Sequence, residues 1–184
     1  MFTPDAEFLA DPAVTYPVTV IAAASDWWEP AIAVDTFVND AAYPISRDNQ
    51  LLDRILAGKS NSGTVRWRSY IKFADIPVES LLRGGKVKNA DLYLWNHLSN
   101  TCGDPVGSGI TARRITSSWT PGSLTWDNQP TVTSAGANNK AGAYSPDCTS
   151  AAASWAKKEW DLVHSVNGIV QAWADGQPNY GFQL

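Results

Sequence analysis

The most regular pattern in the chain covers residues 65–73, where side chains alternate between two faces. The first face is mostly apolar and consists of Val65, Trp67, Ser69, Ile71 and Phe73. The second face is cationic with one aromatic ring and consists of Arg66, Arg68, Tyr70 and Lys72. A period of two is typical of a strand that has one face in a core. We therefore expect a central strand whose second face is turned outward.

A second alternation covers residues 86–97 and divides in the same way. Its apolar side consists of Ala90, Leu92 and Leu94. Its other side consists of Asp91, Tyr93, Trp95 and His97. Further short strands are predicted at residues 18–22, 33–38, 53–57, 110–116, 155–162 and 180–184, with residues 58–63 as a hairpin turn. Residues 131–153 are small and polar, and we expect a connection there.

One helix is predicted near the end of the chain, over residues 165–174. Val166, Ile169, Val170 and Trp173 recur at helical spacing, and Gly176 follows the last of them. Many short strands and one helix predict an all-β protein, an antiparallel β-sandwich with a short helix near the C-terminus. Residues 31–184 form this domain, and residues 1–30 are expected to be an N-terminal extension or linker that packs partly on it.

The two polar faces suggest a binding surface if their strands are neighbours. Aromatic rings stack on sugar rings, and guanidinium groups grip carboxylates or sulfates. The hypothesis is a platform for an acidic polysaccharide, made by Arg66, Arg68, Tyr70, Lys72, Tyr93, Trp95 and His97. Two alternatives stay open: a solvated face on which Asp91 neutralises Arg68 across the strands, or a face covered by the N-terminal segment.

Composition narrows the class of partner. The formal charge is −4 with 17% charged residues, which argues against nucleic acid because such partners need a basic footprint. No run of apolar residues approaches membrane-spanning length, so no membrane insertion is expected. Nine tryptophans, with many Ser, Thr, Asn and Gly between short apolar runs, favour an extracellular β protein. We expect the isolated module to be a monomer.

Cysteine and acidic residues offer two stabilising devices. Cys102 and Cys148 are the only cysteines, and in a secreted domain such a pair predicts a disulfide, whereas in the cytosol they would be free thiols. Asp35, Asp48 and Asp53 are weak candidates for a structural calcium ion. The alternative, which the residue types favour over calcium, is that these residues form Asx turns and solvate a sheet edge.

Catalytic motifs are missing from the sequence. There is no Gly-x-Ser-x-Gly elbow, and the glycines of residues 103–109 lack the Lys-Ser/Thr of a phosphate loop. His97 and His164 have no ligand partners at metal spacing. We therefore expect no enzyme and no catalytic cofactor.

Five motifs occur in an order that resembles one known family. They are residues 35–38 (Asp-Thr-Phe-Val), 68–73 (Arg-Ser-Tyr-Ile-Lys-Phe), the apolar strand 90–95, Trp119 with 125–130 (Thr-Trp-Asp-Asn-Gln-Pro), and 170–176 with 179–181. Together they resemble the DNRLRE domain, also classed as carbohydrate-binding module family 96, over residues 33–184. Residues 8–20 resemble the segment before such domains in large secreted RHS-repeat proteins of actinobacteria.

The resemblance implies a jelly-roll sandwich without catalytic activity in a secreted or cell-surface protein. Its implied partner is a carbohydrate. An alternative is a structural or spacer module that contacts neighbouring domains of a large toxin-like or adhesin-like protein and binds no glycan.

Overall fold

The computed structural model describes residues 33–41, 54–59, 63–76, 82–96, 109–140 and 160–184. The elements in chain order are β1 (Ala33–Asn39), β2 (Gly58–Lys59), β3 (Arg66–Phe73), β4 (Asp91–Asn96), β5 (Ile110–Ile115), the 3-10 turn η2 (Pro121–Ser123), β6 (Val132–Lys140), β7 (Trp160–Ser165), α2 (Asn167–Ala174) and β8 (Phe182–Gln183). The described chain is thus mostly β with one short helix near its C-terminal end, as predicted. No helix in these ranges is long and apolar enough to cross a membrane.

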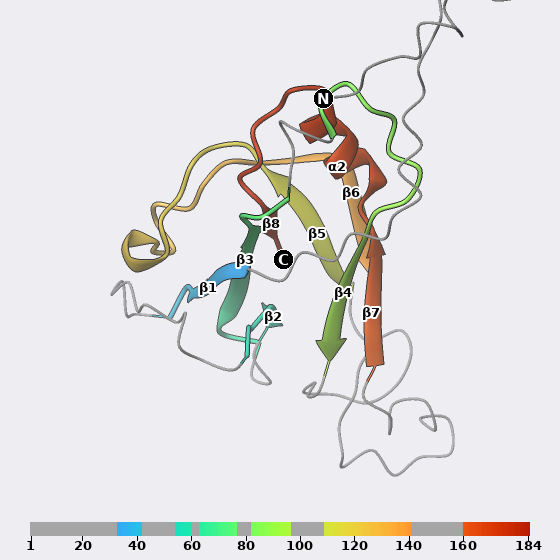
Figure 1. Ribbon diagram of the computed structural model, residues 1–184. Helices are drawn as coiled ribbons and strands as arrows, with labels where there is room; N and C mark the ends of the chain where they lie inside the picture. Colours follow the sequence, from blue (N-terminus) through green and yellow to red (C-terminus); the bar gives the residue numbers. More distant parts are fainter. Residues whose placement is uncertain (1–32, 42–53, 60–62, 77–81, 97–108, 141–159) are drawn as a thin grey trace, which may run out of the picture.

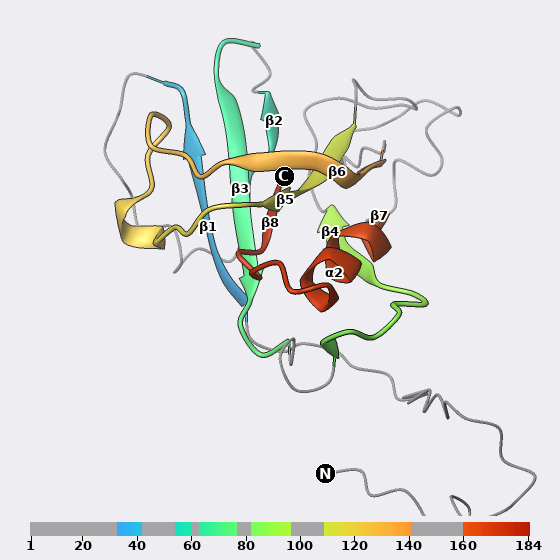
Figure 2. The same ribbon diagram turned by 90° about the horizontal axis from the view of Figure 1, so that it is seen from above.

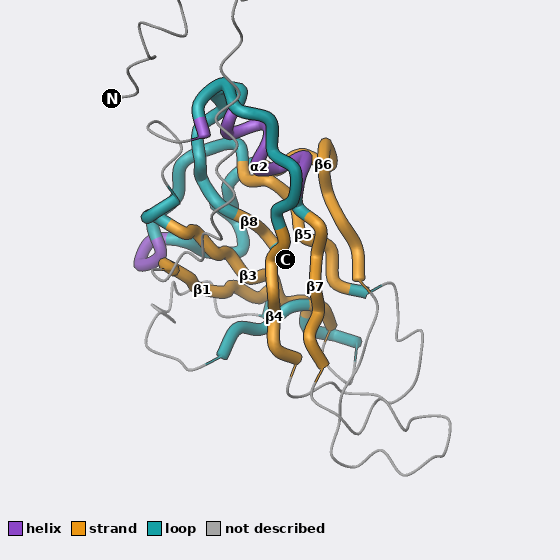
Figure 3. The backbone as a smooth tube through the Cα atoms, turned by 45° about the vertical axis from the view of Figure 1, so that its right-hand side comes forward, coloured by secondary structure: helices purple, strands orange, loops and turns teal. Residues whose placement is uncertain are grey.

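The strands form two antiparallel sheets, seen in Figure 1. The large sheet has the order β1–β3–β8–β5–β6, and β2 also pairs with β3. The small sheet is the pair β4–β7, which lies beside the large sheet in Figure 3. All of these pairings are antiparallel, which confirms the predicted sheet type.

One core lies between the two sheets and α2. Its buried members come from both sheets and the helix and comprise Ile71, Leu92, Ala112, Val166, Ile169, Trp173, Phe182 and Leu184. The apolar face of β3 contributes Ile71, and the apolar side of β4 contributes Leu92. Both alternations therefore predicted the inward residues correctly. The jelly-roll connectivity remains a prediction.

The helix α2 fills one end of this core, between the small sheet and β6 (Figure 2). Ile169 and Trp173 are fully buried, and the Trp173 ring meets the Phe182 ring edge-on at 5.2 Å between centroids. Gly168 lies so close to β6 that a Cβ there would be 3.0 Å from the Cα of Gly136. The predicted helix is thus confirmed, and it starts two residues later than expected.

Several boundaries differ from the predictions. The polar segment after residue 131 was expected to be a connection, but its first part is the edge strand β6. Residues 54–57 carry no strand, and the predicted hairpin pairs only Gly58 with Trp67 and Lys59 with Arg66. β4 begins at Asp91 rather than at residue 86. The predicted strand at 18–22 and the extension 1–30 lie outside the described residues.

Candidate functional site

The polar face of β3 does not face solvent at its centre. Tyr70, predicted to be part of an open platform, is fully buried. The segment between β5 and β6, residues 116–131, folds over this face and brings Leu124 into a second apolar cluster with Val38, Tyr70 and Ile115. The open position predicted for Tyr70 is therefore wrong. The cover comes from residues 116–131, whereas the alternative had named the N-terminal segment.

Two arginines of β3 contact the ring of Trp126, which belongs to the covering segment, residues 116–131. The Arg66 and Arg68 guanidinium carbons lie 5.1 and 4.6 Å from the ring centroid, within cation–π range. Arg66 also forms an ion pair with Asp40, just after β1, and its backbone N–H donates to the same carboxylate at 2.6 Å. These hydrogen bonds hold the pKa of Asp40 below its usual value, so the pair remains charged at neutral pH.

A hydrogen-bond network beneath Trp126 ties the covering segment to the sheet. The Gln129 side-chain oxygen accepts from Arg68 Nη1 at 2.6 Å and from the Tyr70 hydroxyl at 2.7 Å. Gln183 of β8 donates to the Tyr70 hydroxyl at 3.0 Å, and the Gln129 amide donates to the Trp126 carbonyl. Burial raises the pKa of Tyr70 to about 12, so its hydroxyl keeps its proton at neutral pH.

Replacing Gln129 by leucine is expected to destabilise the protein by about 2 kcal/mol. The change leaves the Tyr70 hydroxyl and one Arg68 N–H without their acceptor in a partly buried place. For a domain of this size the melting temperature should fall by about 4–8 °C. The neighbouring Asp127→Ala is the control: Asp127 is exposed, and its loss should cost less than about 0.5 kcal/mol. Equal melting temperatures for the two variants would show that this network does not anchor the segment.

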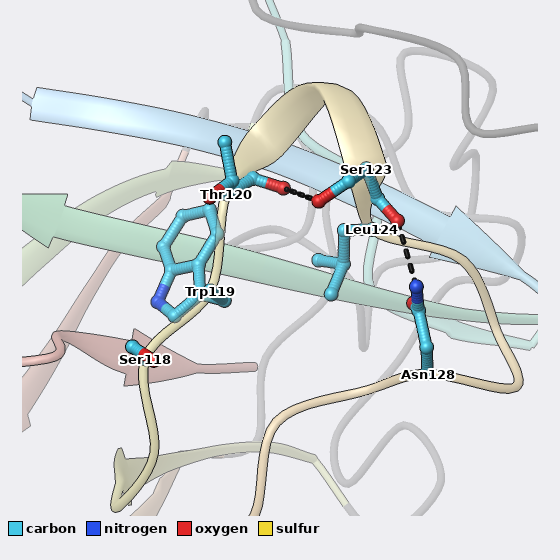
Figure 4. A pocket seen from close by; sticks show the side chains of 6 residues that line it. All are labelled: Ser118, Trp119, Thr120, Ser123, Leu124 and Asn128. Atoms are coloured by element: carbon cyan, nitrogen blue, oxygen red, sulfur yellow. Dashed lines mark hydrogen bonds between the residues drawn. The ribbon is translucent and has the colours of Figure 1, made fainter.

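The covering segment contains a small hollow of about 210 Å³, shown in Figure 4. It is lined by Ser118, Trp119, Thr120, Ser123, Leu124 and Asn128. Its polar groups are largely engaged within the loop, because Asn128 donates to the Ser123 carbonyl at 2.7 Å and accepts from the Thr125 N–H. The Trp119 N–H donates to the Tyr180 carbonyl at 2.8 Å. The hollow is therefore a feature of turn structure.

The small sheet presents a different surface. Tyr93 and Trp95 of β4 are 58% and 59% exposed, more than any other aromatic residue whose side chain the structure describes. They are two residues apart on one strand, so their Cα atoms are about 7 Å apart and their side chains share a face. Their register partners on β7 are Val163 and Asp161. Among the side chains that the structure describes, these are the two most exposed aromatic rings.

The two predicted halves of the platform are not neighbours. β3 pairs with β1, β8 and β2, whereas β4 pairs with β7 in the other sheet. Ile71 and Leu92 point into one core, so the residues that alternate with them point away from it on opposite sides. The expected adjacency is therefore wrong, and so is an Asp91–Arg68 pair. Asp91 instead accepts a hydrogen bond from Asn89 at 2.7 Å.

The remaining predicted residues divide between the two sheets and the undescribed parts. Lys72 lies on the outward face of β3, two residues beyond Tyr70, and is partly exposed. The predicted residues outside the described part of the chain are His97, Cys102, Cys148, Asp48 and Asp53, so the disulfide and most of the calcium set stay predictions.

The remaining calcium candidate is Asp35. Its side chain is half-buried with Oδ1 unpartnered, and burial raises its pKa. Within the described ranges, no three His, Cys, Asp or Glu side chains come together for a metal.

Sequence reasoning missed the partners of the arginines. Trp126 and Gln129 were noted only as members of a family motif, and Asp40 was not singled out. The adjacent motif Trp126-Asp127-Asn128-Gln129 was a signal, since it combines a large ring with amides that can bridge to a sheet. What the sequence could not supply was the position of this segment over β3.

The comparison with known families agrees with the fold. The model of carbohydrate-binding module family 96 matches residues 29–180, which include every described element except β8. Neither the curated proteins nor the solved structures that were compared contain a match. Carbohydrate-binding modules are in general non-catalytic, which confirms that the chain is not an enzyme. The chain belongs to carbohydrate-binding module family 96.

Proposed function

We propose that this module binds a polysaccharide chain on the outer face of β4, through Tyr93 and Trp95. The observation that carries the proposal is their exposure, 58% and 59%, on one face of a regular strand. Burying an aromatic ring removes a large apolar area from water, so leaving two rings open is costly unless a ligand covers them. Membership of a carbohydrate-binding family supports a carbohydrate as the class of ligand.

The small sheet is suited to hold such rings in place. Leu92 and Leu94, which alternate with them, pack into the core or against it and fix the strand. β7 pairs with β4 along its whole length, from Asp91 opposite Ser165 to Asn96 opposite Trp160. A strand held in this way has little conformational freedom left to lose on binding, which favours affinity. The rings can therefore act as a preformed stacking surface.

The arginine face is a weaker candidate for sugar stacking. Trp126 has both neighbouring guanidinium groups against its ring, and Tyr70 is buried. Trp126 is only partly exposed, so it offers less open ring to a sugar than Trp95 does. The acidic-polysaccharide part of the hypothesis thus depends on charge alone on that side of the molecule.

We infer that the module acts outside the cell, in a secreted or surface protein, and as a monomer. The alternative is a spacer that contacts neighbouring domains through Tyr93 and Trp95 and binds no glycan. Electrophoresis through gels that contain single polysaccharides separates the two. We expect retardation by at least one neutral polysaccharide, such as a xylan, a mannan or a soluble cellulose derivative. Unchanged migration in every gel, neutral and anionic, would favour the spacer.

A further inference from the structure

We propose that Asp91 selects the sugar that binds beside the two exposed rings of β4: a unit of a neutral polysaccharide that carries two neighbouring free hydroxyl groups. The inference rests on the proposed binding surface and names the class of ligand that this surface takes. Leu92 points into the core, so Asp91 lies on the outward face of β4 together with Tyr93 and Trp95. Its Cα is about 7 Å from that of Tyr93, because this is the spacing of strand residues two apart.

The Asp91 carboxylate is held in place and has acceptor capacity to spare. Its Oδ2 accepts a hydrogen bond from the side-chain amide of Asn89 at 2.7 Å. A carboxylate has about four lone-pair sites, so this bond leaves most of them for a ligand. An amide has an oxygen acceptor and two N–H donors, so Asn89, whose side chain is exposed, has further capacity as well. The pair therefore presents a compact polar group at one end of the row of rings.

The backbone around this pair is anchored to the start of α2. The Ala90 N–H donates to the Asn167 side-chain oxygen at 2.6 Å, and the Ala90 carbonyl accepts from the Val166 N–H at 2.8 Å. The residue between Asn89 and Asp91 is thus fixed through both of its backbone groups. Polar groups that are fixed before binding lose less conformational entropy when the ligand arrives, and a few such groups set its orientation.

The charge of the outward face of the small sheet favours a ligand without negative charge. The register places six residues on this face, namely Asp91, Tyr93 and Trp95 of β4 with Ser165, Val163 and Asp161 of β7. None of these six positions is basic; Lys88, three residues before Asp91, is exposed and lies outside the strand. Sugar hydroxyl groups can donate to a carboxylate, and hydrogen bonds to an ionised acceptor are the strong ones. A carboxylate or sulfate on the sugar would instead meet a like charge, which lowers affinity.

The test measures migration of the folded protein through gels that contain hydroxyethyl cellulose, xylan or galactomannan, relative to a gel without polymer. Asp91→Ala should bind the retarding polymer about tenfold more weakly than the parent, because it loses hydrogen bonds to a charged acceptor. The matched control is Asp127→Ala, which removes the same charge from an exposed position on the covering segment. Its affinity should stay within about twofold of the parent.

A second comparison uses a carboxymethylated form of the same polymer, with a hydroxyethylated form as the neutral blank for substituent size. The parent should bind the carboxymethylated form more weakly at low salt, and added salt should reduce the difference because it screens the repulsion. Asp91→Asn keeps the shape of the side chain and removes its charge, so it should reduce the difference without salt. A merely structural role of Asp91 would leave the difference unchanged.

The outcomes separate this inference from the proposed function. Parental affinity of Asp91→Ala, together with loss of binding in the Tyr93→Ala and Trp95→Ala double variant, would overturn selection by Asp91 and leave the stacking surface standing. Tighter binding of the carboxymethylated form than of the neutral form by the parent would overturn it as well. Unchanged migration of the parent in every gel would contradict the proposed function, and this inference with it.

Discussion

The variant Tyr93→Ala with Trp95→Ala is expected to lose binding to neutral polysaccharide by about 100-fold. A stacked aromatic ring at the centre of an interface contributes about 1–2 kcal/mol, and about 1.4 kcal/mol corresponds to a factor of ten in affinity. Both rings are more than half exposed, so their removal should change the free energy of unfolding by less than about 1 kcal/mol. Affinity electrophoresis and thermal melting measure the two effects separately.

Tyr93→Phe is the matched control for this variant. It keeps the ring and loses only the hydroxyl, so we expect an affinity within about threefold of the parent if stacking dominates. A loss as large as that of the alanine variant would assign the binding to the hydroxyl and contradict stacking at this position. Retention of parental affinity by the double alanine variant would rule out the β4 surface altogether.

Replacing Gly181 by alanine is expected to cost at least about 3 kcal/mol, a large part of the stability of an ordinary domain. Gly181 has a φ of +87°, a conformation that side chains disfavour, and a Cβ there would lie 2.1 Å from the Ile71 carbonyl oxygen. Its carbonyl accepts from the Ile115 N–H at 3.0 Å, so the clash would separate β8 from both neighbouring strands. The melting temperature should fall by about 10 °C or more, or the protein should fail to fold.

Gly122→Ala is the matched control, because a Cβ at that position would meet no heavy atom within 4 Å beyond its own turn and chain neighbours, and its φ is not positive. Its melting temperature should stay within about 2 °C of the parent, which corresponds to less than about 1 kcal/mol. If Gly181→Ala melted like Gly122→Ala, β8 would not hold the close approach to β3 described above.

The residues that carry the family resemblance mostly build the scaffold. Asn179 donates to the Phe73 carbonyl at 3.1 Å and accepts from the Gly181 N–H, which aligns β8 beside β3. Gln171 of α2 accepts from the Val87 N–H at 2.8 Å and donates to the Gly85 carbonyl at 3.0 Å. Gln129 links the covering segment to β3. These roles explain why the motifs could identify the fold while saying little about the binding surface.

Alternation along β3 predicted which residues point inward, but not whether the outward residues are exposed or covered by another segment. A period of two distinguishes two faces, and it does not say whether water or another segment covers the second. Here Tyr70 alternates with Ile71 and both are buried, because residues 116–131 cover the outward side. In β4 the same pattern left Tyr93 and Trp95 open. The difference arises from contacts between residues far apart in sequence, which local pattern cannot supply.

The order of the strands in the sheets was the other feature that the sequence did not predict. β3 and β4 follow one another among the long strands, so adjacency was a reasonable expectation. On the side away from β1, the neighbour of β3 is instead β8, a strand of two residues that is placed by the Asn179–Gly181 turn. β6 was missed because its residues are small and polar, with Gly136 inside it, and such composition is depleted in strands. It pairs nonetheless with β5 as an edge strand.

The most direct measurement is a titration of the protein with a neutral oligosaccharide, taken from a polysaccharide that retards the protein in a gel. The indole N–H signals in a proton–nitrogen correlation spectrum report the binding. The nine tryptophans give separate signals, and Trp95→Phe and Trp126→Phe assign the two that matter. Stacking on β4 predicts a saturable shift of the Trp95 signal while the Trp126 signal stays in place. A saturable shift of Trp126 with an unchanged Trp95 would contradict the proposed surface.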